Sequence, residues 1–182
     1  MNDPGTFGGD VSGTGTEDGG AITGTLTFTD AGDGASAPNF RIESTDGPAN
    51  GTAGIDASGN WTYTPNVDFN GTDSFTVSVT DDDGNVETHV ISITVLSPSE
   101  QADLLIGRIN DLELAGTLNR GNSNSLRKSL RIKENNGDIG RIRAFIEKVE
   151  AFRNRGKLSD EVATQLLADA ARLLTSLTIS ES

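Results

Sequence analysis

The sequence predicts two domains of different class: an all-β antiparallel sandwich of about seven strands over residues 1–97, then an all-α four-helix bundle over residues 98–182. Residues 1–98 hold 16 of the 22 Gly and all five Pro. They carry 15 acidic residues and one basic residue, a net charge of −14, whereas residues 99–182 have a net charge of +1. Apolar residues alternate with period two before Pro98 and recur at helical spacing after it. The domain junction is therefore expected at Ser97–Ser99.

The strand assignments depend on this alternation and on the turn dipeptides that separate the alternating runs. Phe75, Val77 and Val79 alternate with Ser and Thr, and turn pairs such as Asn70-Gly71 bound the runs. Seven short strands in about a hundred residues are typical of an immunoglobulin-like sandwich. The expected strands are about 6–12, 21–29, 38–44, 50–56, 60–65, 72–80 and 86–96. The predicted core is Leu26, Phe28, Phe40, Ile42, Ile55, Trp61, Tyr63, Phe75, Val77, Val79, Ile91 and Ile93.

The helical half is predicted from apolar spacing and from an internal repeat of 40 residues. The expected helices are about 99–115, 121–134, 138–155 and 159–177. The shift of 40 places Gly116 on Gly156 and Leu118 on Leu158, so the unit is helix, Gly-x-Leu-(Asn/Ser), helix. Gly is expected to end one helix and Asn or Ser to cap the next. Two such hairpins would bury each other's apolar faces as a bundle.

Composition excludes several function classes. The chain has no Cys and one His, so it lacks a thiolate metal site, a disulfide framework and a multi-histidine zinc site. A net charge of −13 disfavours nucleic-acid binding, and no apolar run is long enough for membrane insertion. No nucleophile motif surrounds His89. The sequence therefore predicts a protein that is not an enzyme, with no catalytic residue and no organic cofactor.

Acidic residues gather in the predicted turns, and the sandwich topology sorts these turns to two ends. One end would carry Asp30, Asp33, Asp56 and Asp81-Asp82-Asp83; the other would carry Glu17-Asp18, Asp46 and Asp68. Clustered carboxylates are hard oxygen ligands of the kind that Ca²⁺ prefers. Asp and Asn are also ordinary turn formers and solubilising residues, so spacing alone leaves both interpretations open.

Two stretches of the first half carry a resemblance to a known family. They are Gly59-Asn-Trp-Thr-Tyr-Thr-Pro-Asn66 and Phe69-Asn-Gly-Thr-Asp-Ser-Phe-Thr-Val77, followed by Val79-Thr-Asp-Asp-Asp-Gly84. Over about residues 2–96 the chain resembles the VCBS and bacterial cadherin-like repeats. This resemblance implies an immunoglobulin-like (cadherin-like) fold from secreted or cell-surface bacterial proteins, including adhesins, in which Ca²⁺ often stiffens the repeats. The metal ligands it implies are Glu17, Asp18, Asp30, Asp33, Asp81, Asp82 and Asp83.

The second half resembles the FIMAH domain, a small helical module of secreted or surface-attached bacterial proteins. The resemblance depends on Gly116-Thr-Leu-Asn119, Ser125-Leu-Arg-Lys-Ser-Leu130 and Gly156-Lys-Leu-Ser159, and covers about residues 100–178. The basic stretch Arg131-Ile-Lys-Glu-Asn135 departs from the Ala/Leu-rich helix expected there. The run Arg120–Lys133 is either a solvated helix face or a docking face for an acidic surface.

The combined expectation is a non-catalytic structural and adhesion module of an extracellular or cell-surface bacterial protein. The sandwich would be a Ca²⁺-stiffened spacer or ligand-presenting domain, and the helical domain a terminal interaction module. Its partners would be a surface ligand, protein or glycan, and neighbouring repeats of a longer chain. The alternative is a carbohydrate-binding accessory region of a secreted hydrolase, with Trp61 and Tyr63 as an exposed sugar platform.

Overall fold

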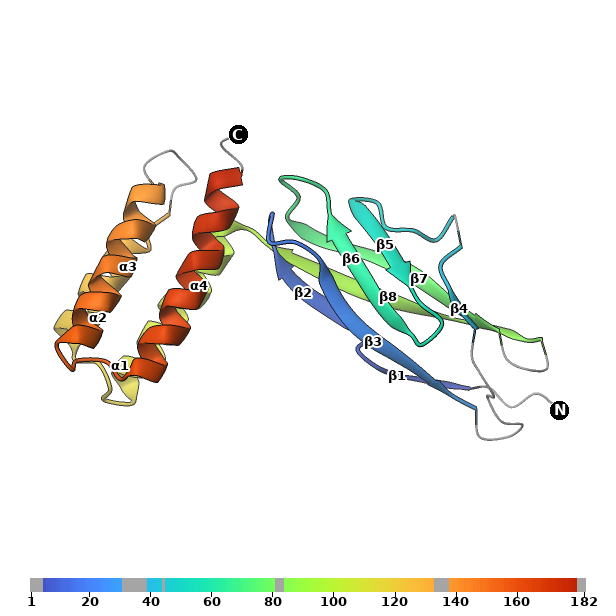
Figure 1. The fold of residues 1–182 in the computed structure, drawn as a ribbon, viewed down its shortest axis with the longest axis horizontal. Coiled ribbons are helices and arrows are strands. Elements are labelled where there is room, and N and C mark those ends of the chain that lie inside the picture. Colours follow the sequence, from blue (N-terminus) through green and yellow to red (C-terminus); the bar gives the residue numbers. More distant parts are fainter. Residues whose placement is uncertain (1–4, 31–38, 44, 81–83, 133–137, 180–182) are drawn as a thin grey trace. The chain divides into compact units, whose positions relative to one another are not determined.

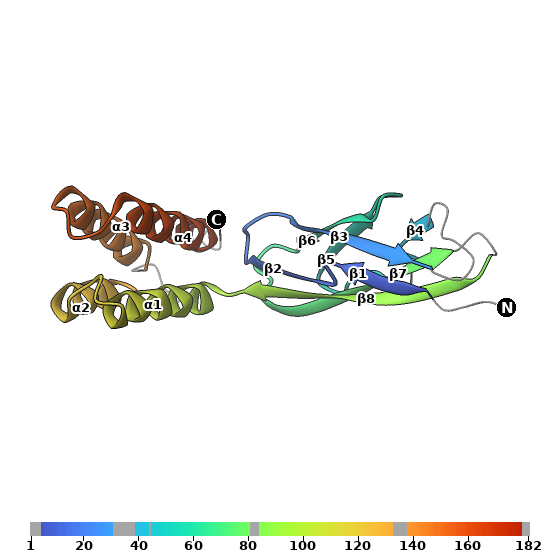
Figure 2. The ribbon, with the colours of Figure 1, turned by 90° about the horizontal axis from the view of Figure 1, so that it is seen from below.

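The computed structural model describes residues 5–30, 39–43, 45–80, 84–132 and 138–179. These residues fall into two compact units, one built from strands and one from helices (Figures 1 and 2). We call them the strand unit and the helical unit and describe each by itself.

The strand unit consists of two four-stranded antiparallel sheets packed face to face (Figure 1). One sheet has the order β1-β3-β6-β5 and the other the order β2-β8-β7-β4. This order is that of an immunoglobulin-like sandwich, as the alternation predicted. The strands are β1 (Thr6–Gly9), β2 (Ser12–Thr16), β3 (Ile22–Thr29), β4 (Asn39–Arg41), β5 (Gly51–Ile55), β6 (Asn60–Pro65), β7 (Gly71–Thr80) and β8 (Val86–Leu96).

The described residues form eight strands, so the expectation of about seven is corrected at the first strand. The predicted strand 6–12 is divided: β1 pairs with β3, and β2 belongs to the other sheet. Gly9 has a φ of +78°, a left-handed conformation that turns the chain out of the first sheet. The indole N–H of Trp61 then donates to the carbonyl of Asp10 at 2.9 Å, and the amide of Ser92 donates to the carbonyl of Val11. The chain therefore changes sheets between Gly9 and Ser12.

The core between the two sheets is made of the inward positions of the alternating strands. Trp61 and Phe75 meet edge to face with ring centroids 5.9 Å apart, and Tyr63 stacks on Phe75 at 6.5 Å. Of the predicted core, Phe28, Ile42 and Ile55 are only partly buried. The buried set is Ile22, Leu26, Phe40, Trp61, Tyr63, Phe75, Val77, Val79, Ile91, Ile93 and Val95.

The helical unit consists of α1 (Pro98–Leu114), α2 (Arg120–Ser129), α3 (Asp138–Asn154) and α4 (Asp160–Ile179). Helix α1 begins with a capping box between Ser97 and Glu100. Helix α2 packs on α1 and α3, and α4 packs on the same two helices, so the apolar faces share one core. The expected second helix, 121–134, is too long: α2 ends at Ser129, and Leu130 follows with a φ of −94°. Residues 133–134 lie outside the described residues.

The two helical hairpins repeat the same turn chemistry at the positions that the 40-residue shift aligns. Gly116 has a φ of +74° and Gly156 a φ of +65°. The buried residue after each of them, Leu118 or Leu158, is followed by the cap of the next helix. The side chain of Asn119 accepts the amide of Asn122 at 2.9 Å, and Ser159 Oγ accepts the amide of Val162 at 3.3 Å. The predicted Gly-x-Leu-(Asn/Ser) unit is therefore present in both turns.

Replacing Gly116 with alanine is expected to destabilise the helical unit by about 1–2 kcal/mol, because its left-handed φ disfavours any side chain. The matched variant is Gly107→Ala inside α1, where alanine is expected to stabilise the helix by about 0.5–1 kcal/mol. An added Cβ would meet nothing within 4 Å at either position, so packing does not bias the comparison. Chemical denaturation measures both. A shift of the same sign in the two variants would contradict the turn assignment.

Candidate metal site

Two of the predicted metal ligands lie side by side in the turn between β2 and β3. Glu17 is buried, with 6% of its surface exposed, and its amide donates to the carbonyl of Leu96 at 2.9 Å. Asp18 has a φ of +53°, a left-handed conformation that Asp adopts more readily than most residues. The amide of Gly19 closes the turn by donating to the carbonyl of Thr16. This turn therefore presents two consecutive carboxylates.

Asp68, in the turn that precedes β7, completes a group of three carboxylates with Glu17 and Asp18. One oxygen from each of the three residues lies within 4.8 Å of the others. Asp68 is exposed and also has a left-handed backbone, with a φ of +59°. Three converging carboxylates repel one another, and a cation bound among them would remove that repulsion. We call Glu17, Asp18 and Asp68 the carboxylate triad.

The structure does not bring the remaining predicted ligands into this triad. Asp30 is buried at the opposite end of β3, which has eight residues and is roughly 26 Å long. It therefore cannot share an ion with Glu17 and Asp18. Asp33, Asp81, Asp82 and Asp83 lie outside the described residues. Asp68 was placed at the same end of the sandwich by topology but was not among the predicted ligands.

A second acidic residue of the strand unit, Asp73, has a structural role that the sequence analysis missed. Its carboxylate accepts the amides of Ala49 at 3.1 Å, Asn50 at 2.7 Å and Ser74 at 2.8 Å. It also accepts the hydroxyl of buried Tyr63 at 2.9 Å. One carboxylate on β7 therefore holds the 49–50 turn and the polar end of a core side chain.

The pKa values of the Asp73–Tyr63 pair follow from this network. Burial alone would raise the pKa of Asp73, but the hydrogen bonds from Asn50, Ser74, Tyr63 and Ala49 stabilise the carboxylate and leave its pKa below the ordinary value. Burial and the neighbouring carboxylate raise the pKa of Tyr63. Both shifts keep Asp73 charged and Tyr63 protonated at neutral pH.

The aromatic residues and the histidine that other functions would need are used in packing. Trp61 and Tyr63 have 1% and 0% of their surface exposed, so they do not form the exposed sugar platform of the alternative hypothesis. His89 is half-buried, and its ring stacks on Phe7 with centroids 5.0 Å apart. Among the described helices, none combines the length and apolarity that crossing a bilayer requires.

The strand order and the acidic turns define a class of protein, the immunoglobulin-like structural modules. Within that class, the chain belongs to the bacterial cadherin-like domain family, whose model matches residues 2–97. Domains of this family are generally non-catalytic, typically extracellular modules of structural or adhesion type.

The other comparisons add one structural likeness. No curated protein matches the chain. Among solved structures, murine CRIg matches at 11% identity with a TM-score of 0.31, covering 52% of this chain and 99% of that one.

Proposed function

We propose that the chain is an extracellular, non-catalytic adhesion module whose strand unit is stiffened by Ca²⁺ at the carboxylate triad. The convergence of Glu17, Asp18 and Asp68 from two separate turns is the observation that carries the proposal. A cation there would link the β2–β3 turn to the turn before β7. A spacer or ligand-presenting domain needs this kind of rigidity.

The residues present fit Ca²⁺ better than other metals. Three carboxylates offer up to six oxygens and no nitrogen or sulfur, and Ca²⁺ takes 6–8 oxygen ligands in flexible geometry. Glu17 is buried, Asp18 is half-buried and Asp68 is exposed, so the triad has both a fixed side and a solvent side. Affinities of extracellular calcium modules are typically about 10⁻⁴–10⁻³ M.

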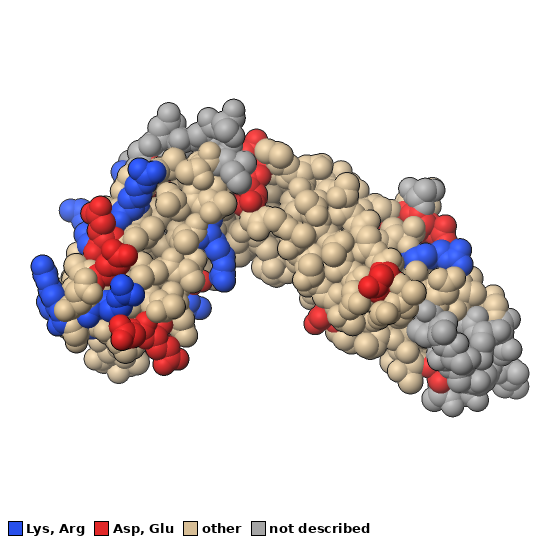
Figure 3. Space-filling view, in the orientation of Figure 1, with Lys and Arg blue, Asp and Glu red and all other residues tan. Residues whose placement is uncertain are grey.

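The helical unit completes the proposal as an interaction module. Its charge differs from that of the strand half: residues 99–182 hold 13 basic residues, whereas residues 1–98 hold one. On the face drawn in Figure 3, the blue Lys and Arg side chains gather over the helices. The resemblance to the FIMAH domain supports the same role.

Adding Ca²⁺ to the EDTA-treated chain is expected to raise the melting temperature of the strand unit. At ten times the dissociation constant, a ligand that binds only the folded state stabilises it by about 1.4 kcal/mol. For a domain of this size, this corresponds to a shift of roughly 5–10 °C. Differential scanning calorimetry with EDTA and then with millimolar Ca²⁺ measures the shift.

The matched variants are Asp68→Asn, which removes one carboxylate of the triad, and Asp46→Asn, which removes a turn carboxylate outside it. The Ca²⁺-induced shift should disappear in Asp68→Asn and persist in Asp46→Asn. A shift that is absent from the unmodified chain, or equal in both variants, would show that these acids serve only as turn formers and solubilising residues.

A further inference from the structure

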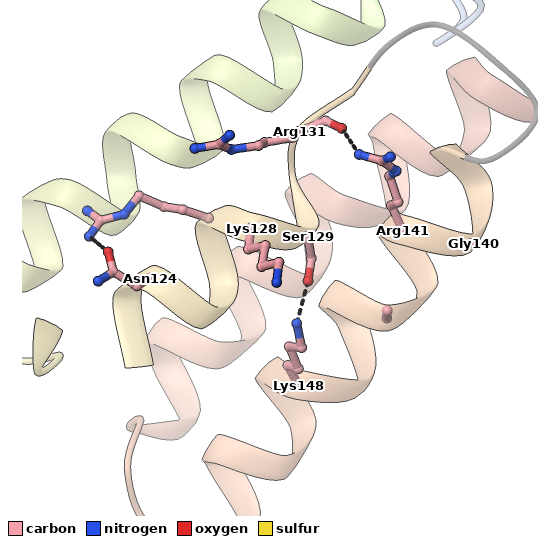
Figure 4. A pocket seen from close by; sticks show the side chains of 9 residues that line it. Asn124, Lys128, Ser129, Arg131, Gly140, Arg141 and Lys148 are labelled. Atoms are coloured by element: carbon pink, nitrogen blue, oxygen red, sulfur yellow. Dashed lines mark hydrogen bonds between the residues drawn. The ribbon is translucent and has the colours of Figure 1, made fainter. Parts of the chain in front are cut away.

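An open groove with a volume of about 880 Å³ lies in the helical unit between α2 and α3. Basic side chains dominate its lining, and they come from both helices and from the segment after α2 (Figure 4). They are Arg127, Lys128, Arg131, Arg141 and Lys148. The small residues Gly140 and Ala144 line the α3 side and leave the groove open. We call this feature the basic groove.

Two of the five cations are already neutralised. Arg127 forms a salt bridge with Glu113 at 2.6 Å and also bonds Asn110 and Asn124. Arg141 lies 3.6 Å from Asp138 and donates to the carbonyl of Arg131. These two guanidinium groups therefore fix the walls of the groove.

The other three cations, Lys128, Arg131 and Lys148, form no salt bridge with any carboxylate in the described part of the chain. Lys148 is half-buried and donates to the carbonyl of Ser125 at 3.1 Å and to Ser129 Oγ at 2.6 Å. Lys128 and Arg131 are exposed. In Figure 4 the side chains of Lys128, Ser129 and Lys148 converge between the two helices.

This convergence distinguishes the groove from a solvated helix face. Lysines on such a face extend into water, whereas two hydrogen bonds hold Lys148 against α2. An ammonium group has three donors, so one donor of Lys148 remains for a ligand. Uncompensated cations in a concave, partly desolvated setting attract anions more strongly than isolated surface charges do.

The lining favours one class of anion. A volume of about 880 Å³ is in the range of sites for ligands larger than a single phosphate. No aromatic residue lines the groove among the described residues, so it offers no stacking surface for nucleic-acid bases. The net charge of −13 also opposes dense polyanions such as duplex DNA, which carries about one charge per 1.7 Å of axis. An acidic oligosaccharide spaces its charges by whole sugar rings and brings hydroxyl groups for Ser129 and Asn124.

We propose that the basic groove binds an acidic oligosaccharide through Lys128, Arg131 and Lys148. The bound groups are carboxylates or sulfates, which accept charge-assisted hydrogen bonds from Lys and Arg. The proposal rests on the helical unit being an interaction module and is independent of the Ca²⁺ site.

Calorimetric titration of the full chain in EDTA tests the proposal, since failure of Ca²⁺ binding does not affect it. The probes are hexagalacturonate, a heparin hexasaccharide, neutral maltohexaose and a dT6 oligonucleotide. At least one acidic hexasaccharide is expected to bind, with affinity falling as salt is raised. The comparison of hexagalacturonate with the heparin fragment distinguishes carboxylate from sulfate recognition.

The variant Lys128→Gln/Arg131→Gln should weaken this binding roughly tenfold, because two charge-assisted contacts are lost. The matched control is Arg143→Gln/Arg155→Gln, which removes two exposed charges of the helical unit that do not line the groove and should change affinity less than about twofold. Equal losses in both variants would reduce the effect to bulk charge and overturn the proposal. So would equal binding of maltohexaose, tighter binding of dT6, or no binding of either acidic sugar.

Discussion

Replacing Phe145 with alanine is expected to destabilise the helical unit by about 3–5 kcal/mol and leave the strand unit unchanged. Phe145 is fully buried in the core that all four helices share, so its loss leaves a cavity. For a domain of about 80 residues, this lowers the melting temperature of the helical transition by more than 10 °C. Calorimetry of the full chain measures both transitions.

Leu114→Ala is the matched control in the same unit. Leu114 is 86% exposed at the end of α1, so its truncation is expected to change stability by less than about 0.5 kcal/mol. If Phe145→Ala lowered the stability of both units equally, the strands and helices would form a single cooperative structure, contrary to the two separate cores.

Asp73→Ala is expected to destabilise the strand unit by about 3 kcal/mol, since hydrogen bonds to a charged group contribute about 1.5–3 kcal/mol and their loss leaves buried donors unsatisfied. Three backbone amides and the hydroxyl of Tyr63 lose their acceptor. Tyr63→Phe removes one donor of the same network and should have a smaller effect, about 1 kcal/mol. Urea unfolding measures both; equal effects would contradict the assignment of Asp73 as the centre of the network.

The same network gives the pH dependence a definite sign. The folded state lowers the pKa of Asp73, so its contribution to stability is present above the unfolded value of about 3.8 and is lost as the pH falls through the lower folded value. Below about pH 4 the unmodified strand unit should therefore lose stability more steeply than the Asp73→Ala variant.

The sequence predicted the strands that carry apolar alternation and failed where that signal is absent. Phe75, Val77 and Val79 are buried as expected. Strand β2 reads Ser-Gly-Thr-Gly-Thr and has no apolar residue, so periodicity does not reveal it. It forms because the chain leaves the first sheet at Gly9 and adds to the edge of the second.

The candidate site was predicted only in part, for a similar reason. The adjacency of Glu17 and Asp18 is visible in the sequence, whereas their proximity to Asp68 depends on two turns about 50 residues apart. The role of Asp73 also depends on a turn more than 20 residues away. Local composition shows that acids gather in turns, but only the sheet topology shows which turns meet.

Direct titration of Ca²⁺ into the EDTA-treated chain tests the central claim most directly. Isothermal titration calorimetry should give one Ca²⁺ per chain at the carboxylate triad, with binding lost in Glu17→Gln/Asp68→Asn and kept in Asp46→Asn. The absence of binding to the unmodified chain, or binding that persists in Glu17→Gln/Asp68→Asn, would contradict a calcium-stiffened module.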